Sequence, residues 1–267
     1  MRLKRRVALD FRELDELDPR ILIQGVEPGA GKDTIGTVSL WGGTGSRVTG
    51  RHRDSLDVTV KFSLDIKRDR YWERAEVFER IMTWASAGGW LTLSQKPGRR
   101  LRVVAAQLPS EGDPLEWTNR YTITFRAYGV PYWQDTQVTR TGSTGSASAS
   151  LTLEVTGNTE TAAEAAITNT SGATVDALTL TAGGSTMAFT GLGLLDGETL
   201  HIDHDDDGRR CVLRIRIEDA GGTFRSALDK RTPQSSDDLT VAPGENAVTL
   251  SAGGAVTLRV WCHGRYA

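Results

Sequence analysis

The sequence is poor in cysteine, in long apolar runs and in excess charge of either sign. Cys211 and Cys262 are the two cysteines among 267 residues, too few for a disulfide framework, so we expect free thiols and a reducing compartment. No run approaches the roughly 18 apolar residues of a membrane helix, and the basic start leads into no apolar signal core. A formal charge of -2 argues against a dedicated nucleic-acid binder, which must neutralise many phosphates.

The two halves of the chain differ in charge and in aromatic content. Residues 1–135 hold 22 basic and 18 acidic residues, giving +4, and the remaining residues hold 10 and 16, giving -6. Six of the seven tryptophans lie in the first half. A stretch of small polar residues at 141–150 has little apolar surface to bury. We therefore predict two domains, at residues 1–138 and 139–267.

The first half predicts strands interrupted by one helix. Residues 20–24, 55–62 and 119–128 show the alternation or β-branched density of strands. Between Asp69 and Ala87, apolar residues recur at helical spacing, and Gly88 follows as a left-handed stop. The apolar positions of this amphipathic helix are Trp72, Ala75, Phe78, Ile81, Met82 and Ala85. We expect this stripe to be core, packed on a sheet, and not a cofactor site.

The second half predicts many short strands separated by Gly, Asn, Asp or Pro turns. The predicted ranges are 151–156, 175–181, 185–190, 198–203, 210–217, 223–227, 238–242, 246–250 and 255–262. Ala-Gly-Gly at 182, 220 and 252 is interpreted as turns between them. This spacing is typical of a β-sandwich, so the chain as a whole is expected to be mainly β.

One glycine-rich segment invites comparison with a phosphate-binding loop. Residues 25–34 follow an apolar strand and contain Gly31 and Lys32. However, Val26 stands where the first glycine of that motif belongs, and Asp33 replaces the hydroxyl residue that binds magnesium. An ordinary Pro-Gly loop is the preferred interpretation.

The acidic segment near residue 205 resembles the start of a calcium loop. Asp203, Asp205 and Asp207 alternate before Gly208, but Arg214 occupies the place of the bidentate glutamate. An acidic hairpin turn is therefore favoured over a calcium site. His201 and His204 flank Asp203, and alternation places His201 and Asp203 on one face of a strand and His204 elsewhere. We interpret both histidines as exposed strand-end residues and assign no metal site.

No catalytic constellation is visible in the sequence. The nucleophile elbow Gly-x-Ser-x-Gly does not occur, and residues 42–46 lack both its spacing and a recognisable base. We assign no catalytic, cofactor-binding or metal residue and expect no enzyme and no cofactor. The basic segment before Val7 is interpreted as leading into an exposed or subunit-facing strand, with contact to nucleic acid as the weaker alternative.

Three motifs in the second half occur in an order that resembles the C-terminal region of phage distal tail proteins (the Dit family). They are residues 195–203 (LDGETLHID), residues 241–248 (VAPGENAV) and residues 261–266 (WCHGRY). The resemblance extends to the first half, where one helix lies among strands and the chain leaves through residues 127–135 (AYGVPYWQD). Residues 42–53 and the Ser/Thr/Gly-rich entry to the second domain match nothing in that pattern.

The resemblance implies a fold, a function and partners. It implies an N-terminal β-barrel-like domain with one helix that closes into a homohexameric ring, and a C-terminal galectin-like β-sandwich. The ring would connect the phage tail tube to the tail-tip hub and leave a lumen for DNA and the tape-measure protein. The implied partners are copies of itself, the tail tube protein, the tail-tip hub or tail-associated protein and receptor-binding proteins. DNA would only pass through, and no membrane is involved. The implied location is the virion tail tip, after assembly in the host bacterial cytoplasm.

Two other functions stay open at this point. The runner-up is a carbohydrate-binding module that recognises a host-surface glycan through an aromatic side chain. The aromatic residues of the second half are Phe189, Phe224, Trp261 and Tyr266. A cell-wall hydrolase ranks third, because no acid, base or nucleophile can be named. The sequence leaves the host, the number of stacked rings, the ring-interface strands and calcium binding at Asp203–Asp207 undecided.

Overall fold

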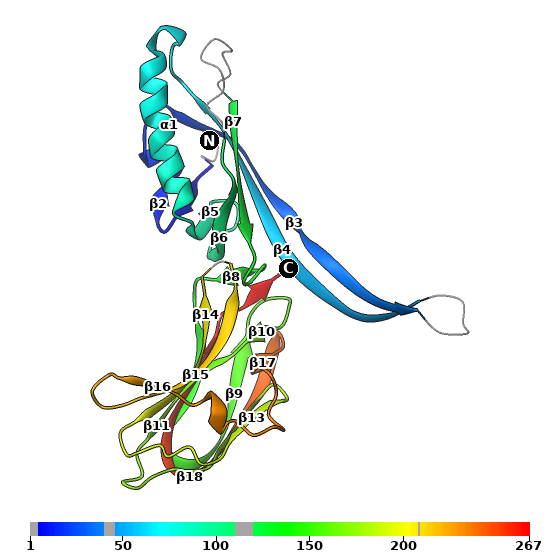
Figure 1. Ribbon diagram of the computed structural model, residues 1–267, viewed down its shortest axis with the longest axis vertical. Helices are drawn as coiled ribbons and strands as arrows, with labels where there is room; N and C mark the ends of the chain where they lie inside the picture. Colours follow the sequence, from blue (N-terminus) through cyan, green and yellow to red (C-terminus); the bar gives the residue numbers. More distant parts are fainter. Residues whose placement is uncertain (1–4, 40–45, 110–119, 208) are drawn as a thin grey trace. The chain divides into compact units, whose positions relative to one another are not determined.

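The chain is mainly β, as the sequence predicted (Figure 1). The computed structural model describes residues 5–39, 46–109, 120–207 and 209–267. These residues form two compact units: an N-terminal unit of residues 1–133 and 206–211, and a C-terminal unit of residues 134–205 and 212–267. None of the helices in the described ranges is both long enough and apolar enough to cross a membrane.

The N-terminal unit is an antiparallel sheet with one α-helix. Its elements are β1 (Val7–Leu9), β2 (Arg12–Glu13), η1 (Leu14–Glu16), β3 (Ile21–Ser39), β4 (Ser46–Leu64), η2 (Arg68–Arg70), α1 (Tyr71–Ser86), β5 (Gly89–Leu93), β6 (Arg99–Gln107) and β7 (Arg120–Ala127). The strands are ordered β2-β1-β5-β6-β7-β4-β3. The first half of β6 pairs with β5 and the second half with β7, so the sheet turns at about Val103–Val104 and curls.

Helix α1 packs its apolar stripe against the inner face of this sheet. Phe78 meets Tyr121 edge-on at 5.2 Å, and the ring of Trp84 meets that of Phe125 at 5.8 Å. The expected helix is confirmed, and Gly88 ends it at φ +63°. Trp72 is an exception, since it is 54% exposed and not part of the core. It lies in the first turn of the helix.

Alternation in β4 and β7 explains the central part of the sheet. Val58 and Val60 of β4 lie opposite Phe125 and Ile123 of β7, and all four side chains are fully buried. The intervening residues of β4 are polar and partly exposed. This pattern of one buried and one solvated face is what period-2 strands produce.

Two expectations for the N-terminal unit are wrong. Residues 25–34 are not a loop, because they lie within β3 and pair with β4 on both sides of a register shift after Pro28. The N-terminal strand Val7–Leu9 is not exposed, since it is hydrogen-bonded to β2 on one side and β5 on the other and its side chains are buried, whereas Arg5 and Arg6 before it are exposed. Met1–Lys4 lie outside the described residues.

The C-terminal unit is a β-sandwich. Its elements are β9 (Thr139–Val155), β10 (Thr161–Ala162), β11 (Glu164–Asn169), β12 (Leu178–Ala182), β13 (Ser185–Phe189), β14 (Thr199–Asp206), β15 (Cys211–Glu218), β16 (Phe224–Ser226), η3 (Leu228–Lys230), β17 (Thr240–Val241), β18 (Gly244–Cys262) and β19 (Arg265–Tyr266). Strand β8 (Trp133–Asp135) leads into it. Each predicted strand of this half overlaps an observed one; β10, β11 and β19 were not predicted.

Two long strands, β9 and β18, connect the two layers of the sandwich. Residues 248–252 of β18 pair with β12, and residues 256–261 pair with β11. Strand β9 accompanies β18 through both parts. One layer is therefore β13-β12-β18-β9 and the other β16-β15-β14-β11-β18-β9. A single apolar cluster fills the space between them, including Leu153, Ile167, Leu180, Phe189, Ile202 and Val260.

The structure corrects the interpretation of two segments of this unit. The small polar stretch at 141–150 lies within the 17-residue strand β9. Ala252-Gly253-Gly254 does not separate two strands but lies inside β18, where the register against β9 shifts as the strand crosses between layers. Glycine suits such a bend because it tolerates close backbone contacts. The Ala-Gly-Gly turns at 182 and 220 are confirmed.

Candidate functional site

The most unusual feature of the N-terminal unit is a two-stranded ribbon that continues β3 and β4 beyond the rest of the sheet (Figure 1). The third strand, β7, pairs with β4 only from Leu56 to Ser63, whereas β3 and β4 stay paired as far as Ser39 and Ser46. We call residues 32–39 and 46–55 the arm. Within the described part of the chain, no third strand joins the arm.

The base of the arm is fixed by ion pairs. Arg126 donates two hydrogen bonds to the Asp57 carboxylate, at 2.5 and 2.7 Å. These bonds hold the pKa of Asp57 below its usual value. Farther out, the Arg53 Nε lies 2.9 Å from Asp33 Oδ1 across the two strands. The arm therefore leaves the sheet from a rigid base.

The arm exposes apolar surface although it has no core of its own. Ile35 is 56% exposed. An isolated two-stranded ribbon is only marginally stable in water and needs a further strand or a packed face. These properties are typical of an element that is completed by contact with another chain.

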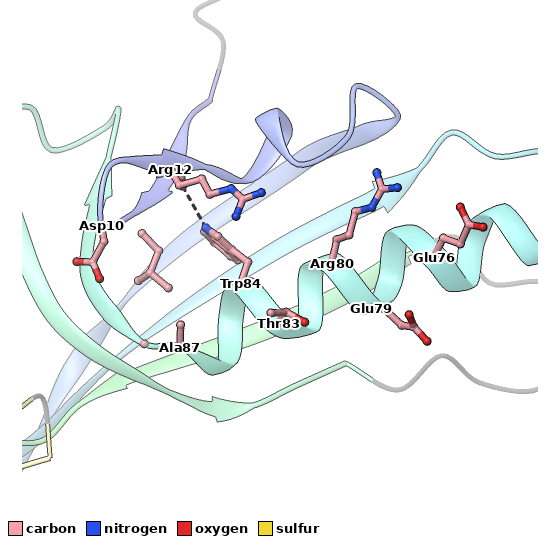
Figure 2. A pocket seen from close by; sticks show the side chains of 10 residues that line it. Asp10, Arg12, Glu76, Glu79, Arg80, Thr83, Trp84 and Ala87 are labelled. Carbon is pink, nitrogen blue, oxygen red and sulfur yellow. Dashed lines mark hydrogen bonds between the residues drawn. The ribbon is translucent and has the colours of Figure 1, made fainter.

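A surface hollow of about 670 Å³ lies between α1 and the β1–β2 turn. Figure 2 shows the Trp84 ring pointing toward Arg12, whose carbonyl oxygen accepts the indole N–H at 3.1 Å, while Arg80 and Glu79 project on opposite sides of the helix. The Asp10 carboxylate is already bonded to the Trp90 amide at 2.8 Å. The hollow thus offers charged groups but no nucleophile paired with a base.

The three aspartates of the calcium-like segment do not converge. The Asp203 carboxylate is bonded to Arg216 Nη2 at 2.8 Å, and Asp205 is bonded to Arg214. Asp207 accepts the backbone N–H groups of Arg209 and Arg210, which forms the turn between β14 and β15. Gly208 lies outside the described residues. The expected acidic hairpin turn is confirmed, and no group of three metal-ligating side chains is found in the described ranges.

The two histidines lie on different faces of β14, as alternation predicted. His201 Nε2 is 2.8 Å from Glu218 on the neighbouring strand. His204 Nε2 lies 2.9 and 3.0 Å from the two carboxylate oxygens of Asp238, and its Nδ1 lies 3.7 Å from Glu164 Oε1. The expectation that both histidines are exposed is wrong, since the side chains of His204 and His201 are only 9% and 22% exposed.

His204 is held as a cation between two carboxylates. Burial opposes its charge, but the hydrogen bond to Asp238 and the nearby Glu164 carboxylate outweigh burial and raise the pKa of His204 to about 9. Burial acts to raise the pKa of Glu164, and the bonds from His204 and Trp261 reverse that effect and lower it. The Trp261 indole donates to Glu164 Oε2 at 2.6 Å. This buried cluster links β11, β14, β18 and the approach to β17.

The motifs that carry the family resemblance build turns. Glu198 Oε2 accepts the Leu195 N–H at 2.8 Å, which closes the turn around Gly197 at φ +81°. Asn246 accepts the Ala242 N–H at 3.0 Å and donates to the Ala242 and Gly244 carbonyls, so it caps the Pro243-Gly244 turn. These residues position the strands and leave no reactive group exposed.

Neither cysteine forms a disulfide bond, and both lie in the described part of the chain. Cys262 faces the sandwich core, where burial raises the pKa of its thiol to about 11. A thiol with that pKa is protonated at neutral pH and is a poor nucleophile. Cys262 is therefore a core residue.

Sequence reasoning missed the arm. Its two strands pair only with each other and have no core to face, so neither shows the alternation that burial of one face produces. The available signal was the glycine-rich segment 42–45 between two runs of similar length, which is the arrangement of a hairpin. Residues 40–45 lie outside the described residues.

Comparisons with solved structures identify the fold. No family model matches the chain, and no curated protein sequence matches it. The Dit protein of phage SPP1, described as a paradigm of the hub of the adsorption apparatus in phages that infect Gram-positive bacteria, is similar over 97% of this chain and 98% of its own. The TM-score is 0.66 at 14% sequence identity.

Two baseplate structures of phage p2 in the activated conformation are also similar. The structure with strontium has a TM-score of 0.49 and covers 97% of each chain, and the structure with calcium has a TM-score of 0.47 and covers 98% of each; both are 10% identical. At these scores neither contributes to the conclusion. Through its likeness to SPP1 Dit, the chain has the fold of a phage distal tail protein over nearly its whole length, as the sequence resemblance implied.

Proposed function

We propose that the chain is a structural protein of the phage virion that forms a homohexameric ring. The ring connects the tail tube to the tail-tip hub and leaves a lumen for DNA and the tape-measure protein. The observation that carries this proposal is the whole-length likeness to SPP1 Dit, which includes both units. The proposed partners are five further copies of the chain, the tail tube protein, the hub or tail-associated protein and receptor-binding proteins, at the virion tail tip after assembly in the host cytoplasm.

The arm supports a ring for a physical reason. In a heterologous interface, one surface of a subunit contacts a different surface of the next subunit. Repeating this contact produces a closed ring when the rotation between neighbouring subunits divides evenly into a full turn. An unsupported ribbon that exposes Ile35 gains most by packing on a neighbouring copy. The N-terminal unit supplies the ribbon and also the sheet on which another ribbon can lie. The proposed role gives the chain no catalytic activity.

Light scattering on the purified chain tests the oligomeric state. We expect a mass of about 174 kDa, six times the 29.0 kDa of one chain, because the subunits assemble into a closed ring. The proposal would be contradicted if the chain had the mass of a single copy at every concentration, both alone and in the presence of tail tube protein. A denatured sample provides the single-chain reference.

Glycan recognition is a second candidate function, supported by one exposed aromatic residue. Phe224 is 46% exposed, whereas Phe189 is buried. The Arg216 guanidinium lies 4.2 Å from the centre of the Phe224 ring, and polar groups beside an exposed ring are typical of sugar sites.

A glycan array tests this second candidate. If it is right, the wild-type chain binds at least one surface glycan and Phe224→Ala loses that binding by about tenfold, since stacking on the ring is removed. Leu228→Ala is the matched control, because Leu228 is 52% exposed in the same unit but aliphatic. Equal binding by Phe224→Ala and the wild type would exclude this site.

A further inference from the structure

The outer edge of β9 is the one long strand edge of the C-terminal unit that the described residues leave open. In the opposite layer, the edge strand β13 is covered, since its Ala188 and Thr186 carbonyls accept the N–H groups of Thr232 and Ser236. At the far side of the sandwich, the edge strand β16 has only three residues. Strand β9 has 17 residues and pairs only with β18.

The usual protections of an edge are missing from the first part of β9. Natural sheets protect edges with proline, lysine, bulges or covering segments. Residues 139–143 (TRTGS) have no proline and no lysine and run in register with β18 from Cys262 to Leu258. No backbone hydrogen bond of the described residues reaches the outer side of this stretch. Its outward N–H and C=O groups are therefore available to another strand.

Beside this edge lies a groove with a distinct chemistry. It has a volume of about 800 Å³ and is lined by Arg140, Gly142, Arg259 and Trp261, among others. Trp261 lies directly across from Arg140, and Arg259 directly across from Gly142, so all four occupy one face of the sheet. A side chain at position 142 would meet the Leu258 carbonyl oxygen at 2.5 Å. Glycine at this position therefore allows β9 to approach the backbone of β18 closely beside the groove.

The groove carries positive charge that the unit does not neutralise. Arg140 and Arg259 are exposed, and neither has an ion pair with a carboxylate of the described residues. The nearest carboxylate on this face, Glu164, is engaged by the Trp261 indole and by the His204 cation. Two guanidinium groups beside an indole form the residue combination that dominates binding hot spots.

We propose that the edge of β9 at Thr139–Ser143 accepts an extended, acidic segment of a partner protein as an added strand. Backbone pairing would satisfy the open edge, and alternate side chains of the added strand would lie on the groove face. Carboxylates at those positions would meet Arg140 and Arg259 and pack beside Trp261. Small or β-branched residues would occupy the positions between them, next to Thr139 and Thr141.

Charge and backbone geometry favour this occupant over the others. A second copy of β9 would bring two further arginines to the same face, and like charges at close range are unfavourable. A free anion or an anionic sugar could meet the arginines but would leave the backbone edge unpaired. The proposal does not depend on ring formation, because it concerns an edge of the C-terminal unit only.

A short synthetic peptide tests the proposal on the full chain. The probe is the acetylated heptapeptide Thr-Glu-Thr-Glu-Thr-Glu-Thr, and binding is followed by NMR or calorimetry together with amide hydrogen exchange. We expect saturable binding, slower exchange at residues 139–143, and about tenfold weaker binding by the double variant Arg140→Gln/Arg259→Gln because the charged contacts are lost. Arg209→Gln is the matched control and should bind normally.

Three further measurements separate the alternatives. The same peptide with lysine for glutamate, or with proline for its central glutamate, should fail to bind, because the first reverses the charge and the second breaks strand pairing. If the proline peptide bound equally well, or if inorganic phosphate displaced the peptide fully, the groove would be a simple anion-binding site. Either result would overturn the proposal. Absence of peptide binding, or pairing of two copies through β9, would also overturn it. The oligomeric mass of the double variant Arg140→Gln/Arg259→Gln shows whether the ring still forms. A failure of the strand-addition proposal can therefore be distinguished from a failure of ring assembly.

Discussion

Replacement of residues 34–52 by an Asn-Gly turn is expected to yield a folded chain that no longer forms hexamers. Asp33 and Arg53 lie opposite each other in the register of β3 and β4, so a two-residue turn can close the shortened hairpin there. The pairing of β4 with β7 starts at Leu56 and is left intact. The expected change is from about six chains per particle to one, measured by light scattering.

The controls for the shortened arm address folding and specificity. Circular dichroism should match the wild type and unfolding should stay cooperative, because the removed residues pair only with each other in the described structure. Ile35→Ser is the matched point variant, since it removes exposed apolar surface from an otherwise complete arm, and it should weaken the ring without abolishing the arm. A shortened chain that still assembles into hexamers would place the subunit interface elsewhere.

Replacement of His204 by alanine is expected to destabilise the C-terminal unit by about 2–3 kcal/mol at pH 6, because it leaves the Glu164 and Asp238 carboxylates without their cation. The two carboxylates are each about one-third exposed, which places the cost below that of a fully buried pair. Denaturant unfolding gives the total effect. Hydrogen exchange of the β11 and β14 amides gives the local effect.

The same cluster predicts the direction of the pH dependence. The pKa of His204 rises from 6.5 in the unfolded chain to about 9 in the folded protein. Its contribution is therefore fully present below about pH 6.5 and is lost as the pH rises through 9, to a total of about 3 kcal/mol. Between pH 6 and pH 10 the wild-type unit should lose stability, whereas His204→Gln should show a much flatter profile.

His201→Gln is the matched control for the pH experiment. His201 contacts a single carboxylate, Glu218, and lies on the other face of β14. The variant retains His204 and should retain the loss of stability near pH 9. A wild-type profile that stays flat from pH 6 to pH 10 would show that His204 is not a stabilising cation.

Element type was predictable from the sequence wherever burial imposed a period. The alternation of Val58, Val60 and Phe62 predicted a strand of the sheet, and the spacing of Phe78, Ile81 and Ala85 predicted α1, because each set faces one core. Strand length was not predictable. Strand β18 passes through Gly253-Gly254, and β9 consists largely of serine, threonine and alanine, so local propensity indicated breaks that long-range pairing overrode.

The candidate sites were less predictable because they depend on contacts distant in sequence. The partners of His204 lie 40 and 34 residues away in the chain, and only the fold brings Glu164 and Asp238 to it. Strand-end histidines with no local partner suggest exposure, which is wrong here. The groove beside β9 likewise joins Arg140 to Trp261 through a pairing that spans more than 120 residues. Neither could be read from local spacing.

The most direct test of the proposed function is electron microscopy of the purified full-length chain mixed with tail tubes. The account predicts six-fold rings with a central hole, seated at the ends of the tubes. Tubes with bare ends beside single, unassembled copies of the chain would contradict it.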